Sequence, residues 1–301
     1  MAIDVQGLCK SYGSHQVLNK LHFHIDSGIF GLLGDNGAGK TTLMKILATL
    51  LSFDEGEVDI FGHSLRKEPD AIRSLLGYLP QHFDFFPNVT IMESMNYIAT
   101  LKGIQGERHI QKEVSLRLME VGLTHHAHKK VKQLSGGMKQ RFGIAQAMLG
   151  QPKLLIVDEP TVGLDPKERI AFRNLLQSYG EDCIVLLSTH IVPDISSTCE
   201  KLLILREGRC LYQGLIDDMI RTLEGKVWLA DVDKRQLEQL SQQARIVSVV
   251  RKDGRLQARL LCDRPPDCCT EVVPETANLE DAYLHISEEG ESIGCDKKPK
   301  L

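Results

Sequence analysis

The stretch "GIFGLLGDNGAGKTTLMKIL", residues 28–47, decides how the chain folds. The apolar run "GIFGLL" predicts a buried strand, and a glycine-rich loop follows it from Gly34. After the loop, apolar residues recur at helical spacing on one expected face: Leu43, Ile46, Leu47, Leu50 and Leu51. A strand, a glycine-rich loop and a helix in this order predict an α/β fold with a parallel sheet.

The loop "GDNGAGKTT" has the spacing of a phosphate-binding loop. Its glycines allow backbone N–H groups to surround a phosphate, Lys40 supplies a positive charge, and the Thr41 hydroxyl can bind Mg²⁺. A glycine-rich turn formed by chance is the alternative, but the strand before it and the helix after it both fit. We therefore expect the loop to bind a nucleotide through Gly34, Asp35, Asn36, Gly37, Ala38, Gly39, Lys40, Thr41 and Thr42.

Three more apolar runs predict further buried strands: "LLGYLPQ" from Leu75, "KLLIVDE" from Lys153 and "CIVLLSTH" from Cys183. Continuous apolar runs are typical of strands that are covered on both faces. Each run ends in polar residues, namely Gln81, Asp158–Glu159 and Ser188–His190. Ligands of open α/β sheets bind at the carboxyl ends of the strands. The polar endings therefore predict one shared site.

These polar residues suit the hydrolysis of a nucleotide. Asp158 can hold Mg²⁺ through water, and Glu159 can orient or deprotonate an attacking water. Either carboxylate could instead cap a helix or be a surface charge, but its place beside the phosphate loop favours catalysis. Gln81 and His190 can reach the same γ-phosphate. Tyr12 could stack on the base or be an ordinary strand tyrosine.

Two further segments differ from this alternating pattern. A helical insert is expected at about 83–140, with Thr90 and Glu93 as a capping box. The histidines of "THHAH" at 124–128 suggest a metal site, but a solvated linker between helices is the better interpretation. Residues 215–301 predict a small α+β appendage with strands, a helix over 234–243 and a disordered polar tail from Glu288.

Composition limits the classes of protein. The chain has 301 residues and a net charge of −4, which argues against a nucleic-acid partner. No apolar run reaches the ~18 residues that a membrane-spanning helix needs. The N-terminus is too polar for a signal peptide, and the 8 cysteines form no CxxC pair. We expect reduced thiols and a cytoplasmic protein.

A second anion site is predicted in "KQLSGGMKQR", residues 132–141, because Ser135 and the glycines after it precede a helical row. The "LSGGMKQR" part resembles the signature motif of the ATP-binding cassette family. The other motifs follow in the order of that family: glycine-rich loop, "PQ", signature, "VDEPTVGLDP" and "STH". The resemblance covers residues 1–214 and implies a P-loop NTPase (RecA-like) core with a helical subdomain.

The resemblance also implies roles for single residues. Tyr12 is the adenine-stacking aromatic, Gln81 the Q-loop glutamine and a Mg²⁺ ligand, Asp165 the D-loop aspartate, and His190 the switch histidine. In this family two cassettes face each other head to tail, so Ser135, Gly136 and Gly137 would close on ATP bound by a second subunit. Glu159 and the signature are intact, so both sites of a homodimer could be active. Asp35 stands where many relatives have proline, and we expect it to point away from the phosphates.

The resemblance implies the ATPase subunit of a membrane transporter that exports a drug, antibiotic or peptide, similar to the ABC-2 branch. Separate permease subunits would dock on the helical insert, and the chain would lie on the cytoplasmic face of the membrane. A soluble cassette ATPase of translation or DNA repair is the alternative, and a module that senses ATP without hydrolysing it is a third. The appendage could brace a dimer or act as a regulatory sensor.

Overall fold

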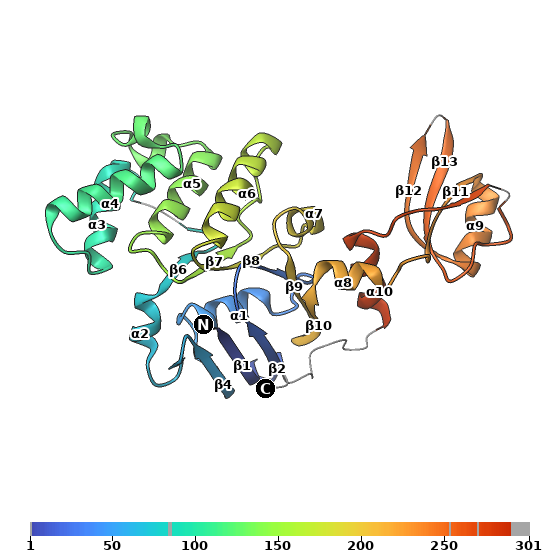
Figure 1. The fold of residues 1–301 in the computed structure, drawn as a ribbon, viewed down its shortest axis with the longest axis horizontal. Helices are drawn as coiled ribbons and strands as arrows, with labels where there is room; N and C mark the ends of the chain where they lie inside the picture. The colour runs from blue at the N-terminus through green and yellow to red at the C-terminus, as the bar shows by residue number, and fades with distance from the viewer. Residues whose placement is uncertain (1, 84–85, 253, 270, 290–301) are drawn as a thin grey trace. The chain divides into compact units, whose positions relative to one another are not determined.

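The computed structural model describes residues 2–83, 86–252, 254–269 and 271–289, and Figure 1 shows its ribbon. These residues form two compact units, the first ending at Gln213 and the second beginning at Gly214. Within the four described ranges, no helix is long and apolar enough to cross a membrane.

Two β-sheets form the framework of the first unit. The six-stranded sheet has the order β10-β9-β3-β8-β7-β6, and β9, β3, β8, β7 and β6 run parallel to their neighbours in this series. Its strands are β3 (Ile29–Leu33), β6 (Leu76–Leu79), β7 (Leu154–Asp158), β8 (Ile184–Ser188), β9 (Lys201–Arg206) and β10 (Arg209–Leu215). The predicted parallel sheet and its four buried runs are thus confirmed.

The second sheet of this unit is antiparallel, with the order β2-β1-β4-β5. Its strands are β1 (Ile3–Tyr12), β2 (His15–Ile25), β4 (Glu55–Ile60) and β5 (His63–Ser64). Buried and exposed positions are mixed along β1 and β2. The search for continuous apolar runs missed this sheet for that reason.

Helix α1 (Lys40–Leu47) packs against both sheets, since it contacts β2 and β7 and its apolar side chains join the core that the two sheets share. The prediction that this helix continues to Leu50 and Leu51 is wrong. The chain leaves the helix after Leu47, Thr49 has a left-handed φ of 61°, and Leu50 is 63% exposed. Of the predicted apolar face, Leu43, Ile46 and Leu47 are buried.

The helical subdomain gathers α3 (Ile91–Leu101), α4 (Glu107–Glu120) and α5 (Gly136–Ala147), drawn in green shades in Figure 1. Thr90 and Glu93 form the predicted capping box of α3. His125 and His126 lie in the short helix η1 (Thr124–His126), which contacts α4. The remaining helices of the unit are α2 (Pro69–Ser74), η2 (Val131–Gln133), α6 (Pro166–Gly180) and α7 (Val192–Ser196).

The second unit is a four-stranded antiparallel sheet, β12-β13-β11-β14, with three helices. Its elements are α8 (Ile216–Arg221), β11 (Val227–Val232), α9 (Lys234–Gln243), β12 (Arg245–Lys252), β13 (Arg255–Leu261), β14 (Val272–Pro274) and α10 (Leu279–Glu289). Helix α9 has the predicted bounds. The tail was expected to begin at Glu288, but α10 includes Glu288 and Glu289, and residues 290–301 lie outside the described ranges.

Inside this unit a buried ion pair joins β13 to α10. Arg259 Nε and Nη2 donate to the two carboxylate oxygens of Asp281, at 2.8 Å and 2.6 Å. Asp281 is completely buried. The paired guanidinium therefore holds a charge that the interior alone would not tolerate.

Cysteines occur in both units, and free thiols are found at Cys9, Cys183, Cys199, Cys262, Cys268 and Cys269. Burial raises the pKa of the Cys183 thiol to about 11.

Candidate functional site

The phosphate loop joins β3 to α1, and its shape depends on glycine. Gly39 precedes α1 with a φ of 104°, and no side chain caps the first turn of the helix. A Cβ at Gly39 would lie 2.7 Å from Leu18 Cδ2, and one at Gly34 would lie 2.3 Å from the Leu205 carbonyl oxygen. The loop is therefore pressed against β2 and β9, and the amides that begin α1 suit an anion.

Lys40 lies inside this loop and is only 6% exposed. Its Nζ donates to the carbonyl oxygens of Gly34 at 2.6 Å and Asp35 at 3.1 Å. Burial lowers the pKa of Lys40, and the carboxylates of Glu159 and Asp158 partly offset this. The Lys40 ammonium therefore lies near Asp158 and Glu159, and its positive charge can balance the negative charge of a phosphate. Asp35 itself is on the exposed part of the loop.

Asp158 is the last residue of β7 and pairs in register with Ser188, the last residue of β8. Only 1% of Asp158 is exposed. Burial raises the pKa of its carboxyl group, and the Ser188 hydroxyl lowers it. The Glu159 carboxylate raises the pKa further, while Thr41 and Lys40 lower it. A carboxylate in this position is costly for the fold unless a cation joins it.

The donor set around Asp158 fits Mg²⁺. Within the described ranges, Asp158 Oδ1 and Ser188 Oγ are buried without a hydrogen-bond partner. The Thr41 hydroxyl is close enough to Asp158 to lower its pKa. Carboxylate, hydroxyl and water oxygens are the ligands that Mg²⁺ prefers.

Glu159 and His190 are brought together at the same edge of the sheet. Glu159 follows β7 with a left-handed φ of 48°, and its N–H donates to the Ser188 carbonyl oxygen at 2.9 Å. Its Oε2 lies 2.7 Å from His190 Nδ1. Glu159 is buried, whereas the His190 side chain is about half exposed. A non-glycine residue held in this backbone conformation is strained, and such strain concentrates at functional sites.

The signature motif begins α5 as the sequence indicated. Ser135 is the N-cap, and its Oγ accepts the N–H of Met138 at 3.2 Å. The two glycines differ: a Cβ at Gly136 would meet nothing within 4 Å, whereas one at Gly137 would lie 2.0 Å from Glu168 Oε1. Gly136 therefore faces open space, and Gly137 allows α5 to pack closely in its own chain.

Gln81 lies in a cavity of about 430 Å³, which Gly136, Lys139 and Gly163 also line. The structure thus places the residue after β6 beside the signature helix. Asp165 is the N-cap of α6, and its Oδ1 accepts the N–H of Glu168 at 2.8 Å.

Tyr12 ends β1 with an exposed ring. The Lys10 ammonium lies 5.7 Å from the centre of that ring. An exposed ring leaves a face for a base to stack on.

The sequence reasoning missed one buried link. Thr161 Oγ1 donates to Asp194 Oδ2 at 2.6 Å, and Arg173 Nη1 lies 3.9 Å from the other oxygen of Asp194. Thr161 follows Glu159 closely, and Asp194 follows His190. The bond therefore ties together the two segments that carry these residues. Asp194 lies within α7, so no signal in the sequence indicated this link.

The chain is similar to known proteins in sequence and in fold. Residues 18–162 match the family described as "ABC transporter". The "Uncharacterized ABC transporter ATP-binding protein YxlF" of Bacillus subtilis (strain 168) is 33% identical, over 94% of this chain and 99% of that protein. The chain belongs to the ABC transporter family. As an ABC protein it is an ATP-binding subunit with ATPase activity, and the transport role is favoured over translation or DNA repair.

Two further comparisons agree with this ABC assignment. The "Nod factor export ATP-binding protein I" of Bradyrhizobium diazoefficiens is 31% identical, over 95% of this chain and 96% of that protein. A solved structure described as "Structure of ATP binding subunit of ABC transporter" has a TM-score of 0.67 and 29% identity, and covers 74% of this chain. The P-loop NTPase core predicted from the sequence is thus confirmed.

Proposed function

We propose that two copies of this ABC subunit form a head-to-tail dimer with two composite ATP sites. The phosphate loop of one copy holds the ATP, and Ser135 and Gly136 of the other copy contact its γ-phosphate. The open face of Gly136 carries the proposal, because a helix start without a side chain can approach a phosphate closely. Gly137 adds its backbone N–H, and Asp165 at the start of α6 completes the nucleotide site.

The residues of each site have separate tasks in the hydrolysis of ATP. Lys40 balances charge on the β- and γ-phosphates, and Tyr12 stacks on the adenine. Asp158, Thr41 and Gln81 would hold Mg²⁺, which would supply positive charge to neutralise phosphate oxygens. Glu159 accepts a proton from the attacking water. His190 holds the Glu159 carboxylate in place across the 2.7 Å contact.

We further propose that separate permease subunits bind the chain on the cytoplasmic face of the membrane and export a drug, antibiotic, peptide or similar substrate. The Nod factor export protein among the relatives supports export. A surface groove of about 380 Å³ suits a permease segment, because aromatic and aliphatic side chains of α3 and the chain after β6 line it. Exposed apolar side chains at this groove include Phe86, Tyr97 and Leu101. Such a patch is typical of a protein interface.

The dimer is tested with Glu159→Gln, which keeps ATP but loses the proton acceptor, so that closed dimers accumulate. Size-exclusion chromatography should show a dimer with Mg·ATP and a monomer with ADP. In this background Gly136→Asp sets a carboxylate against the partner's γ-phosphate, and the dimer should disappear while ATP still binds. Gly136→Asn adds a side chain of the same size without the charge, so it should weaken the dimer less than Gly136→Asp does, and the difference measures the repulsion of the two charges. A monomer in Glu159→Gln with Mg·ATP refutes the composite site.

A mixing experiment tests whose phosphate is contacted. Lys40→Ala and Gly136→Asp should each be inactive alone. Their mixture forms heterodimers with one intact composite site, so part of the ATPase activity should return. If heterodimers form and stay inactive, the signature does not act across the dimer.

The groove is tested by pull-down of the permease from a detergent extract. Leu101→Asp should lose the permease and keep the ATPase activity of the isolated chain, because Leu101 is 67% exposed at the groove. Leu50→Asp is the matched control, since Leu50 is equally exposed after α1. Equal recovery of the permease with both variants contradicts docking at this groove.

A further inference from the structure

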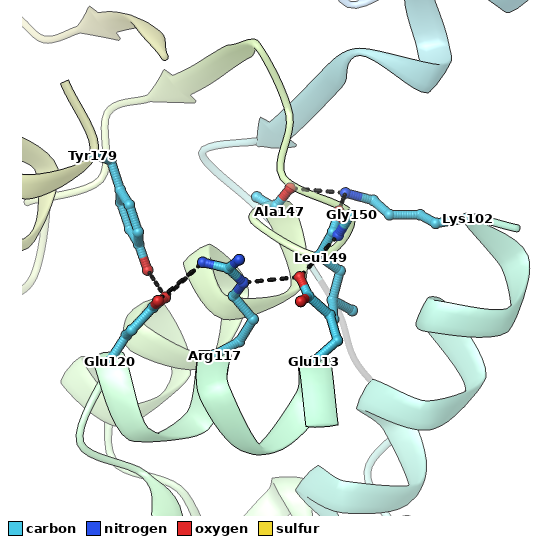
Figure 2. A network of polar contacts seen from close by, with 8 residues as sticks. All are labelled: Lys102, Glu113, Arg117, Glu120, Ala147, Leu149, Gly150 and Tyr179. Carbon is cyan, nitrogen blue, oxygen red and sulfur yellow. Dashed lines mark hydrogen bonds and ion pairs between the residues drawn. The ribbon is translucent and has the colours of Figure 1, made fainter. Parts of the chain in front are cut away.

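A network of polar side chains joins the far ends of the helices that begin at the nucleotide site (Figure 2). Arg117 of α4 is its centre. Its Nε donates to Glu113 Oε1 at 3.0 Å, and its Nη1 donates to Glu120 Oε2 at 2.8 Å. The Tyr179 hydroxyl, in the last turn of α6, donates to the same Glu120 oxygen at 2.9 Å. Helix α6 is thus linked to α4 through one carboxylate.

The same network holds the end of α5. Lys102, the residue that follows α3, donates from Nζ to the carbonyl oxygens of Ala147 at 2.7 Å and Leu149 at 2.8 Å. The N–H of Gly150 donates to Glu113 Oε1 at 3.2 Å. The carboxyl end of α5 is therefore held by α3 and α4 (Figure 2). We call Lys102, Glu113, Arg117, Glu120 and Tyr179 the helix-end network.

Several side chains of the helix-end network are buried. Arg117 and Tyr179 are each 5% exposed, and Glu113 is also buried. Burial, and then the nearby Glu120 carboxylate, raises the pKa of Tyr179, so its hydroxyl stays protonated and remains a donor. Hydrogen bonds to a charged acceptor are stronger than those between neutral groups. Loss of one contact leaves a buried polar group without its partner.

In the proposed composite site, the opposite ends of the two helices lie at the nucleotide. Helix α5 begins with the signature glycines and has 12 residues, and α6 begins after Asp165 and has 15 residues. At 1.5 Å per residue they are about 18 Å and about 22 Å long. A change of about 5° in tilt at the network would move the start of α5 by about 1.6 Å. Displacements of this size matter for the alignment of reacting groups.

We propose that Tyr179 and Glu120 are positioning residues for the ATPase, which set the angle between α5 and α6 and so the approach of the signature to the partner's ATP. This inference rests on the composite site described above. Neither residue belongs to the proposed composite site, so they act through the helices. The hydroxyl of Tyr179 joins α6 to the helical subdomain, and its removal should loosen the angle without changing the phosphate loop.

Tyr179→Phe tests the inference because it removes one oxygen only. In the Glu159→Gln background we expect the ATP-dependent dimer to weaken roughly tenfold, which corresponds to about 1.4 kcal/mol. In the otherwise unchanged chain kcat should fall, while the dissociation constant of the monomer for ATP stays the same. Tyr283→Phe, the same change on a tyrosine of α10 in the second unit, is the control and should change neither quantity. Glu120→Gln should behave like Tyr179→Phe, and the double variant should lose less than the sum of the two.

The outcomes separate this inference from the composite site. If Glu159→Gln alone forms no dimer with Mg·ATP, the composite site is refuted and the positioning role with it. If that dimer forms and Tyr179→Phe leaves its dissociation constant and kcat at the level of Tyr283→Phe, only the positioning role is refuted. A loss of ATP binding in the Tyr179→Phe monomer would show a general structural defect and also refute positioning.

Discussion

Replacing Asp158 by asparagine should stabilise the fold and abolish the activity. The carboxylate is buried at the end of β7, and one of its oxygens has no hydrogen-bond partner within the described ranges. Burial raises its pKa above the ordinary value of 3.8. Each pKa unit corresponds to about 1.4 kcal/mol between the two charge states. We therefore expect Asp158→Asn to raise the free energy of unfolding at neutral pH, measured in EDTA without nucleotide.

The direction in which the stability changes with pH follows from the number of protons that the folded and unfolded states bind. Between 3.8 and the raised pKa, the folded protein holds more protons than the unfolded chain, so the stability from this group is present at acidic pH and is lost as the pH rises through the folded pKa. The asparagine cannot ionise. The advantage of Asp158→Asn should thus be smaller at about pH 4 than at about pH 8. Urea unfolding at both values measures it, with Asp182→Asn, the same change on an exposed carboxylate, as the control.

Mg·ATP should reverse the order of stability of the wild type and Asp158→Asn. A ligand at a hundred times its dissociation constant stabilises a protein by about 2.7 kcal/mol. The wild type should gain this with Mg·ATP, whereas Asp158→Asn should gain no more than with ATP in EDTA. Lower stability of Asp158→Asn without nucleotide at neutral pH, or an undiminished effect of Mg²⁺, would falsify this account of Asp158.

The remaining predictions use single variants. Lys40→Ala should lose ATP binding, because the phosphate charge then has no counter-charge in a buried loop; near-normal affinity by fluorescence titration would contradict this. Tyr12→Phe should bind ATP like the wild type and Tyr12→Ala should bind it more weakly, and equal affinities would show that the ring does not stack on adenine. Asp281→Asn should destabilise the second unit by about 3 kcal/mol, because Arg259 loses its charged partner. Fluorescence of Trp228, the single tryptophan, reports unfolding of that unit, and an unchanged urea midpoint would contradict this role for the pair.

Signals between near neighbours in the sequence predicted much of the core. Each buried strand and the polar residue that ends it are adjacent in the chain, so Asp158 and His190 could be assigned to the edge of the sheet before the structure. The signal for helix α9 was also local, because Asp233 and Gln236 form a capping box at its start. The phosphate loop from Gly34 could also be predicted from residues that are adjacent in the sequence.

Features that depend on distant contacts were not accessible. Nothing in "ATL" after Leu47 signals the end of α1, and only packing places Thr49 in a left-handed conformation. The bond between Thr161 and Asp194 spans 33 positions, and that between Glu120 and Tyr179 spans 59. Polar residues at such separations carry no periodic pattern, so their pairing exists only in the folded chain.

The phosphate loop packs closely against β2 and β9, so its shape depends on residues that lie outside the nucleotide site. Because Leu18 and Leu205 lie where a side chain on the loop glycines would lie, local opening of β2 or β9 would also release the shape of the loop. Nucleotide should therefore slow hydrogen exchange of backbone amides in β2, a strand outside the catalytic sheet. A substitution at Leu18 that frays β2 would then be recorded in an assay as a loss of affinity for ATP, although the change lies in the antiparallel sheet.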